Sequence, residues 1–154
     1  SKNKLKYRSS DNHQLVLKQY RKLYGERIKD FSKKDFDHFN IICYKLKASK
    51  RIEVREITNE VGTELHAAII LLKDKRRIYN MVSCIFEEGK KSLANYFLFD
   101  QVIREFSGKK LVWDLEGSDV KGIAYFYEKF SSFNQPYQFL KWNRLPKIIR
   151  VIKS

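Results

Sequence analysis

Cysteine is scarce in this chain, and no stretch of it is apolar enough to be a membrane helix. Only Cys43 and Cys84 are present, which is too few for a disulfide framework. Each lies among apolar residues, so we expect two buried free thiols in a protein of the reducing cytoplasm. No apolar run approaches the ~20 residues of a membrane-spanning helix, and the first ten residues lack the apolar core of a signal peptide.

Several patterns that carry chemistry are also absent from the sequence. His13, His38 and His66 lie far apart, with no cysteine or acid at ligand spacing, so we predict no metal site. No Gly-x-Ser-x-Gly elbow of a serine hydrolase is present. Residues Gly89–Ser92 (GKKS) imitate the end of a P-loop, but the upstream glycine that a P-loop requires is missing. These absences argue against a metalloenzyme, a serine hydrolase and an ATP-binding P-loop.

Positive charge is abundant and lies mainly at the two ends of the chain. The 154 residues carry 32 Lys and Arg against 18 Asp and Glu, for a net charge of +14. Residues 1–34 contribute +8 and residues 138–154 contribute +5, so the middle is nearly neutral. Basic ends indicate anionic partners, such as coenzyme phosphates or tRNA. Lys and Tyr alternate at Lys2–Arg8 and Lys18–Tyr24, which leaves open a non-catalytic domain that binds nucleic acid.

The length of the chain and its hydrophobic content of 43% predict one folded domain over residues 1–154. The expected elements are a strand at Lys4–Arg8, a helix from Asp11 to about Tyr24, a helix from Ser32 to about Ala48, strands at Ile52–Thr58, Thr63–Lys73 and Ile78–Phe86, a helix at Gly89–Phe106, a strand at Lys110–Glu116, a helix at Asp119–Phe130, and strands at Tyr137–Trp142 and Ile148–Ile152. This order predicts an α+β fold, with a mixed, mostly antiparallel sheet of about seven strands and about four helices.

Three local patterns refine these expectations. Ser32 followed by Asp35 predicts a capping box at the start of the second helix. The apolar run AAIILL within Thr63–Lys73 is typical of a strand that is buried on both faces. The alternation within Ile78–Phe86 places Ile78, Val82, Cys84 and Phe86 on one face of their strand.

The segment Gly117–Phe133 (GSDVKGIAYFYEKFSSF), which follows the strand-like LVWDLE, carries a family resemblance. It resembles the last α/β unit of the GNAT acyltransferases, in which a strand runs into a helix with a Tyr-Glu-Lys-x-Gly-Phe-like signature. The matching residues here are Tyr127, Glu128, Lys129 and, after one extra residue, Phe133. The same run is similar to a segment of the Fem-type peptidoglycan aminoacyltransferases, which share the fold. Both resemblances imply acyl transfer to an amine, and they leave the donor open.

The resemblance implies a catalytic acid, and the pattern of acids suggests a base. The tyrosine that matches Tyr127 lies beside the acyl thioester in many GNAT members, where it can protonate the departing thiolate. The resemblance implies the same role for Tyr127. It can equally be a core aromatic residue, since apolar side chains surround it in the sequence. Glu116 is the candidate base, because it ends a predicted strand where open α/β sheets bind ligands. Asp114, Glu87 and Glu88 occupy similar positions at strand ends.

A candidate donor site follows the strand Ile78–Phe86. Gly89 allows close backbone approach, and Lys90, Lys91 and Ser92 would lie in the first turn of the next helix, where anions bind favourably. In GNAT enzymes the equivalent junction, which extends here to Asn95, holds the pyrophosphate of coenzyme A. This chain has one glycine there, and two lysines stand in place of small residues. Alternatively, Ser92 only caps a helix and the two lysines are solvated.

The resemblance further implies that Ile78–Phe86 splays away from Lys110–Glu116. The exposed backbone of Val82, Ser83 and Cys84 would then pair with the pantetheine arm of the donor. The leading hypothesis is an N-acyltransferase that moves an acyl group, such as acetyl, from acyl-CoA to a primary amine of a small molecule or peptide. The alternatives are a Fem-like domain that uses aminoacyl-tRNA and the nucleic-acid-binding domain.

Overall fold

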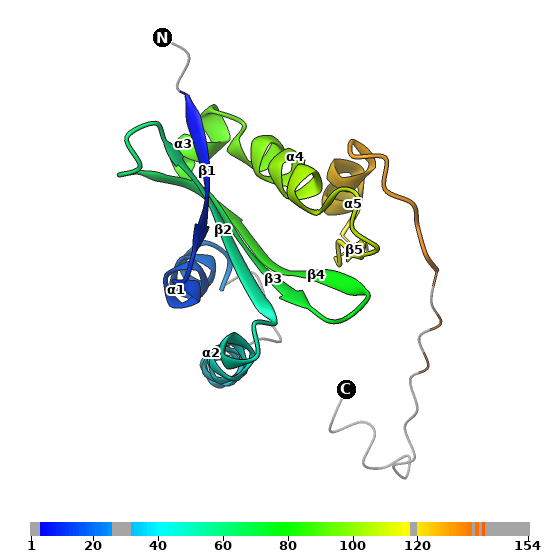
Figure 1. Cartoon of the computed structure of the whole chain (residues 1–154). Coiled ribbons are helices and arrows are strands. Elements are labelled where there is room, and N and C mark those ends of the chain that lie inside the picture. The colour runs from blue at the N-terminus through cyan, green and yellow to red at the C-terminus, as the bar shows by residue number, and fades with distance from the viewer. Residues whose placement is uncertain (1–3, 26–31, 118–119, 137, 139, 141–154) are drawn as a thin grey trace, which may run out of the picture.

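The computed structural model describes residues 4–25, 32–117, 120–136, 138 and 140, and Figure 1 shows a central sheet between two groups of helices. The elements are β1 (Leu5–Ser10), α1 (His13–Tyr24), α2 (Lys33–Ala48), β2 (Ile52–Asn59), β3 (Leu65–Lys73), β4 (Arg77–Ile85), α3 (Glu87–Lys91), α4 (Ala94–Phe106), β5 (Val112–Asp114) and α5 (Lys121–Glu128). The predicted α+β class is therefore confirmed. The described residues form five strands and five helices, where the sequence predicted about seven and about four.

The strands lie side by side in chain order, β1-β2-β3-β4-β5. The first four pair antiparallel, and only β4 and β5 run parallel. The parallel pairing is short, because it joins Arg77–Tyr79 to Val112–Asp114 and goes no further. Beyond Tyr79, β4 continues to Ile85 paired with β3 and no longer with β5. The two strands thus form a fork, as the resemblance implied.

Both faces of the sheet are covered, with α1 and α2 on one face and α3, α4 and α5 on the other (Figure 1). Alternate side chains of β3 pack into the two cores, one on each face of the sheet. Ala67, Ile69 and Leu71 belong to the core beneath α4, whereas Ala68 and Ile70 belong to the core beneath α1. All five are fully buried. Two-sided burial is what the continuous apolar run of this strand predicted.

A β-bulge at Met81 interrupts β4. Asn80 pairs with Leu71 and Val82 pairs with Ile70, so Met81 is left out of the register. One extra residue reverses which side chains face each layer. Consequently Ile78 joins the α4 core while Val82 and Cys84 join the α1 core. The prediction that these side chains share one face was wrong, because simple alternation does not reveal a bulge.

Two predicted boundaries also differ from the structure. The helix expected at Gly89–Phe106 is broken into α3 and α4, since Leu93 adopts a left-handed φ of 54° between them. Asn12, not Asp11, caps α1. The capping box of Ser32 and Asp35 is present as predicted.

The expected final strands lie almost wholly outside the described residues. Of Tyr137–Trp142 only residues 138 and 140 are described, and neither belongs to a strand; Ile148–Ile152 lies outside altogether. Within the part of the chain that is described, no helix is both long and apolar enough to cross a bilayer.

A partly buried ion pair holds α4 to the sheet. Arg55 of β2 is 6% exposed, and its Nε donates to a Glu105 carboxylate oxygen at 2.8 Å. The Tyr7 hydroxyl of β1 donates to the same carboxylate. The bond from Arg55 lowers the pKa of Glu105 below its ordinary value, against the opposing effect of burial. The last turn of α4 is thereby linked to two strands.

We expect the variant Glu105→Gln to lower the free energy of unfolding at pH 7 by about 2 kcal/mol, because a charged hydrogen-bond acceptor is lost. A lowered carboxyl pKa stabilises the fold above the unfolded value of about 4.3, and this contribution is lost as the pH falls through the folded pKa. The free energy of unfolding in urea, measured from pH 7 to pH 3, should therefore fall less for the variant than for the wild type. An equal fall with pH in the two proteins would contradict the prediction.

Candidate active site

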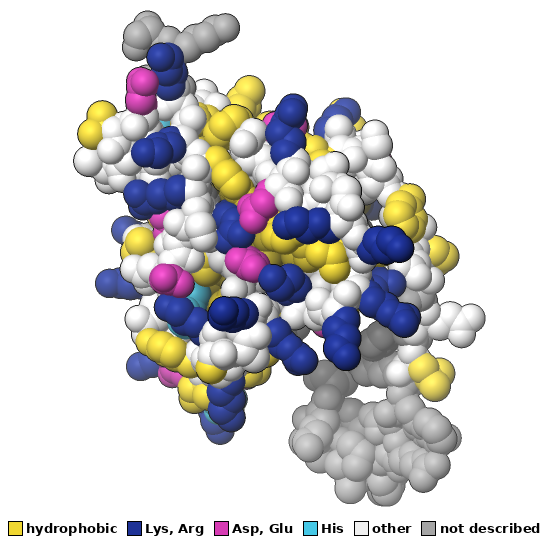
Figure 2. Space-filling view, in the orientation of Figure 1, with side chains coloured by type: hydrophobic (Ala, Val, Ile, Leu, Met, Phe, Trp, Pro, Cys, Tyr) yellow, Lys and Arg dark blue, Asp and Glu magenta, His cyan; other side chains and the backbone are white. Residues whose placement is uncertain are grey.

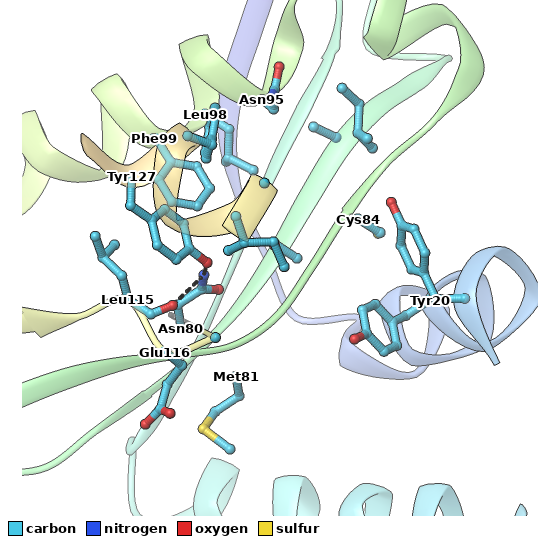
Figure 3. Close-up of a pocket in the computed structure, with 18 residues that line it drawn as sticks. Tyr20, Asn80, Met81, Cys84, Asn95, Leu98, Phe99, Leu115, Glu116 and Tyr127 are labelled. Carbon is cyan, nitrogen blue, oxygen red and sulfur yellow. Dashed lines mark hydrogen bonds between the residues drawn. The ribbon is translucent and has the colours of Figure 1, made fainter. Parts of the chain in front are cut away.

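A cavity of about 520 Å³ lies where β4 and β5 part, and its lining comes from six places in the chain (Figure 3). The splayed half of β4 contributes one wall, and α4 and α5 contribute a largely apolar wall opposite. The turn after β5, Ala67 of β3, and the α1 residues Tyr20 and Tyr24 complete the lining. The fork in the sheet therefore opens into a ligand-sized cavity.

Tyr127 of α5 belongs both to the core and to the cavity wall. Its side chain is 8% exposed, and its ring stacks on Phe99 with the centroids 5.7 Å apart. Its hydroxyl oxygen accepts a hydrogen bond from Asn80 Nδ2 at 3.0 Å. Burial raises the pKa of Tyr127 to about 12, although the bond from Asn80 acts in the opposite direction. The hydroxyl therefore stays protonated throughout the neutral pH range.

Glu116 also lines the cavity, at its rim. The residue is exposed, and its carboxylate points away from the Tyr127 hydroxyl (Figure 3). Its φ of 54° is left-handed, as is the φ of 72° at Gly117. Holding a non-glycine residue in this conformation costs about 1 kcal/mol. The strained turn places an acidic side chain at the cavity mouth.

The other acids considered as a base are already paired. Arg77 Nη1 donates to Asp114 at 3.1 Å. Glu87 and Glu88 accept from Lys90 and Lys91 within α3. Of the four candidate acids, Glu116 alone lines the cavity.

The three β4 residues predicted to meet the donor lie differently. Ser83 and Cys84 line the cavity, whereas Val82 does not and packs beneath α1. Cys43 and Cys84 are both buried free thiols, as the sequence predicted. Burial raises the pKa of Cys84 to about 12. Its thiol is therefore not a nucleophile at neutral pH.

The junction that was predicted to bind phosphate has a different local structure. The helix begins at Glu87, so the first turn of α3 is acidic, and Lys90 and Lys91 stand in its last turn. The start of α4 at Ala94 has no side-chain cap, and its first N–H groups lack partners within the helix. Asn95, in the same turn, lines the cavity. The N-terminus that faces the cavity is thus that of α4.

Gly89 and Ser92 attach α3 to β3. A Cβ on Gly89 would lie 1.9 Å from the His66 carbonyl oxygen, so this position requires glycine. The Ser92 hydroxyl lies 2.9 Å from His66 Nδ1 and donates to the Glu88 carbonyl at 2.9 Å. Both residues hold the junction in place, and their predicted contact with a donor stays a prediction.

Sequence reasoning missed Asn80, the bulge at Met81, and the two tyrosines of α1. One signal was available, because Asn80 is a polar residue inside the otherwise apolar centre of a strand. A buried polar side chain needs a specific partner. The bulge left no such mark in the sequence.

Basic side chains do not gather into one patch on the face seen in Figure 2. Lys and Arg are scattered over most of the visible surface, with acidic side chains among them. Several of the described lysines are paired with acids, as in Lys73–Glu53 and Lys4–Glu60. In the part of the chain that the structure describes, no group of three metal-binding side chains was found.

No protein-family model matches the chain, and no curated protein matches it. Solved structures do match. A GCN5-related N-acetyltransferase from Ralstonia eutropha aligns with a TM-score of 0.69 and 13% identity, over 90% of this chain and 99% of that one. A possible acetyltransferase from Clostridium difficile aligns with a TM-score of 0.64 and 13% identity, over 92% and 99%.

A predicted acetyltransferase from Clostridium acetobutylicum, whose structure contains acetyl-CoA, aligns with a TM-score of 0.57 and 15% identity, over 91% of this chain and 96% of that one. The similarity to Fem-type aminoacyltransferases is not shown by these comparisons. Identities this low establish the fold alone. The chain has the fold of the GNAT acetyltransferases, as the resemblance of Gly117–Phe133 implied.

Proposed function

We propose that this protein is an N-acyltransferase that moves an acyl group, such as acetyl, from acyl-CoA to a primary amine. The observation that carries the proposal is the fork between β4 and β5, whose cavity has the Tyr127 hydroxyl in its wall. A strand edge, a buried proton donor and an exposed acid meet there. Acyl transfer from a thioester to an amine needs a proton donor and a proton acceptor of this kind.

The shape of the fork supports coenzyme A as the carrier of the acyl group. Beyond Tyr79, β4 pairs with β3 on one edge, and no described strand lies along the edge that faced β5. The backbone of this free edge can pair with the amide groups of a pantetheine arm. The uncapped start of α4 lies at the same cavity. Helix N-termini bind phosphates well, and Lys90 and Lys91 immediately precede this turn. The acetyl-CoA in the Clostridium acetobutylicum structure is consistent with this assignment.

The proposed reaction conserves protons in the following way. The amine nitrogen attacks the thioester carbon, and Glu116 takes a proton from the amine. The carbon–sulfur bond then breaks, and Tyr127 gives its hydroxyl proton to the departing thiolate. Met81, which the bulge leaves out of the register with β3, lines the cavity, and we assign its main-chain N–H as a donor to the oxyanion. The products are an amide and free coenzyme A.

Calorimetric titration with acetyl-CoA tests the proposal. We expect micromolar binding, which the variant Lys90→Glu with Lys91→Glu should weaken about tenfold, equivalent to about 1.4 kcal/mol. Two positive charges beside the start of α4 become negative, which opposes binding of a pyrophosphate. An amine screen with the wild-type protein then identifies the acceptor class.

The matched control is Lys109→Glu with Lys110→Glu. These two exposed lysines follow the opposite end of α4, which is about 20 Å long. This variant should bind acetyl-CoA almost as the wild type does. Acetyl-pantetheine, which lacks the nucleotide, should bind the Lys90/Lys91 variant and the wild type equally. Absence of coenzyme A binding, with salt-sensitive binding of tRNA, would overturn the proposed function.

A further inference from the structure

Asn80 lies at the apex of the fork. It directly follows Tyr79, the last β4 residue that pairs with β5. Its side chain is buried, with 6% exposed, and reaches across to the other branch of the fork. Nδ2 donates to the Leu115 carbonyl at 3.2 Å and to the Tyr127 hydroxyl oxygen at 3.0 Å (Figure 3). One amide group therefore connects β4 to the turn after β5 and to α5.

These two bonds determine the orientation of the Tyr127 hydroxyl. A carbonyl oxygen can only accept, so the bond to Leu115 assigns the NH₂ group of Asn80 to this side. Both amide hydrogens are then in use, one on each acceptor. The Tyr127 oxygen accepts from Asn80 and so keeps its own hydrogen for a different partner. The cavity lies beside it.

Packing does not account for an asparagine at this position. Asn80 Oδ1 is buried without a hydrogen-bond partner among the described residues, and an unpaired buried acceptor destabilises a fold. The surrounding core, which includes Ile78, Leu98 and Phe99, is apolar. An aliphatic side chain would fill the same space without this cost.

We propose that Asn80 is a positioning residue for acyl transfer, which directs the Tyr127 hydroxyl hydrogen toward the leaving sulfur and stabilises the phenolate that remains. The inference rests on the proposed function. The direction of the Asn80 contribution agrees with it, since this bond lowers the pKa of Tyr127 against the larger effect of burial. Without Asn80, the proton would leave a buried oxygen that has no donor beside it.

The variant Asn80→Asp tests the inference with almost no change in size. A carboxylate oxygen replaces the NH₂ group, accepts the Tyr127 hydrogen and turns it away from the cavity. We expect kcat with acetyl-CoA to fall about 100-fold, as for the loss of a general acid. The Kd of coenzyme A, measured by calorimetry, should change less than about twofold, equivalent to about 0.4 kcal/mol.

Two further measurements separate positioning from a structural effect. In the Tyr127→Phe background, Asn80→Asp should lower kcat no further, because the two side chains act as one unit. With an aryl thioester, whose thiolate leaves without protonation, the loss caused by Asn80→Asp should nearly disappear. Additive losses in the double variant, or an equal loss with the aryl thioester, would overturn the inference.

A second substitution keeps the test decisive if Asn80→Asp does not fold. Asn80→Ser retains one hydroxyl donor, so it should keep more activity than Asn80→Ala. Equal activity of these two variants would contradict the inference.

If the wild type binds coenzyme A but acylates no amine, the proposed function fails separately. NMR of ring-labelled tyrosine then tests the bond itself, because the Tyr127 Cζ signal must shift in Asn80→Ala, and an unchanged signal would overturn it.

Discussion

Replacing Tyr127 with phenylalanine is expected to lower kcat for acyl transfer by about 100- to 10,000-fold, which is the usual contribution of a general acid. Phenylalanine keeps the ring that stacks on Phe99 and removes only the hydroxyl. Binding of acetyl-CoA should therefore stay within about twofold of the wild type. Steady-state kinetics together with calorimetry measure the two effects independently.

The matched control is Tyr125→Phe. Tyr125 lies on the same helix but is 61% exposed, and its ring contacts the Lys129 ammonium group. It does not line the cavity, so the same substitution should leave kcat unchanged. Because the pKa of Tyr127 is about 12, deprotonation of this group should not limit the wild-type rate near neutral pH. Wild-type rates in Tyr127→Phe would leave Tyr127 with a packing role only.

Replacing Gly89 with alanine is expected to lower the free energy of unfolding by about 3 kcal/mol, the upper end of the usual range for overpacking. The added Cβ would lie 1.9 Å from the His66 carbonyl oxygen and 2.7 Å from its carbon. Both are backbone atoms of β3, so no flexible side chain can yield. Either α3 moves away from the sheet or the strand bends. Urea unfolding measures the loss.

Gly122→Ala is the control for this substitution. Nothing lies within 4 Å of a Cβ at Gly122, which belongs to α5. Alanine is favoured over glycine within a helix by about 0.8–1 kcal/mol, so this variant should be as stable as the wild type or more so. Equal stability of Gly89→Ala and the wild type would mean that α3 does not require the close contact with β3.

The order and type of most elements could be predicted from the sequence. The capping box at Ser32 and the apolar run of β3 are local patterns, and each formed the element expected of it. The signature around Tyr127 also predicted the GNAT fold, because it combines a strand, a turn and a helix in a fixed order. Local patterns succeed when the same residues that form an element also contain its signal.

Parts of the site could not be predicted in this way. The sequence suggested a helix starting at Gly89, yet the structure has α3 starting at Glu87 and α4 at Ala94. At this junction Gly89 and Ser92 contact His66, a residue of β3. Such contacts between distant segments have no local signature.

By itself, the sequence of this protein determined a mixed α+β domain of GNAT type, two buried thiols, and Tyr127 as a candidate acid. Only the tertiary structure decided which face each β4 residue occupies, since that depends on a bulge at Met81 against β3. It also decided that Asn80 connects both branches of the fork to Tyr127. The physical reason is that the spacing of apolar residues indicates which side chains of a single helix or strand are buried. Strand register and hydrogen-bond partners, in contrast, arise only when separate elements pack together.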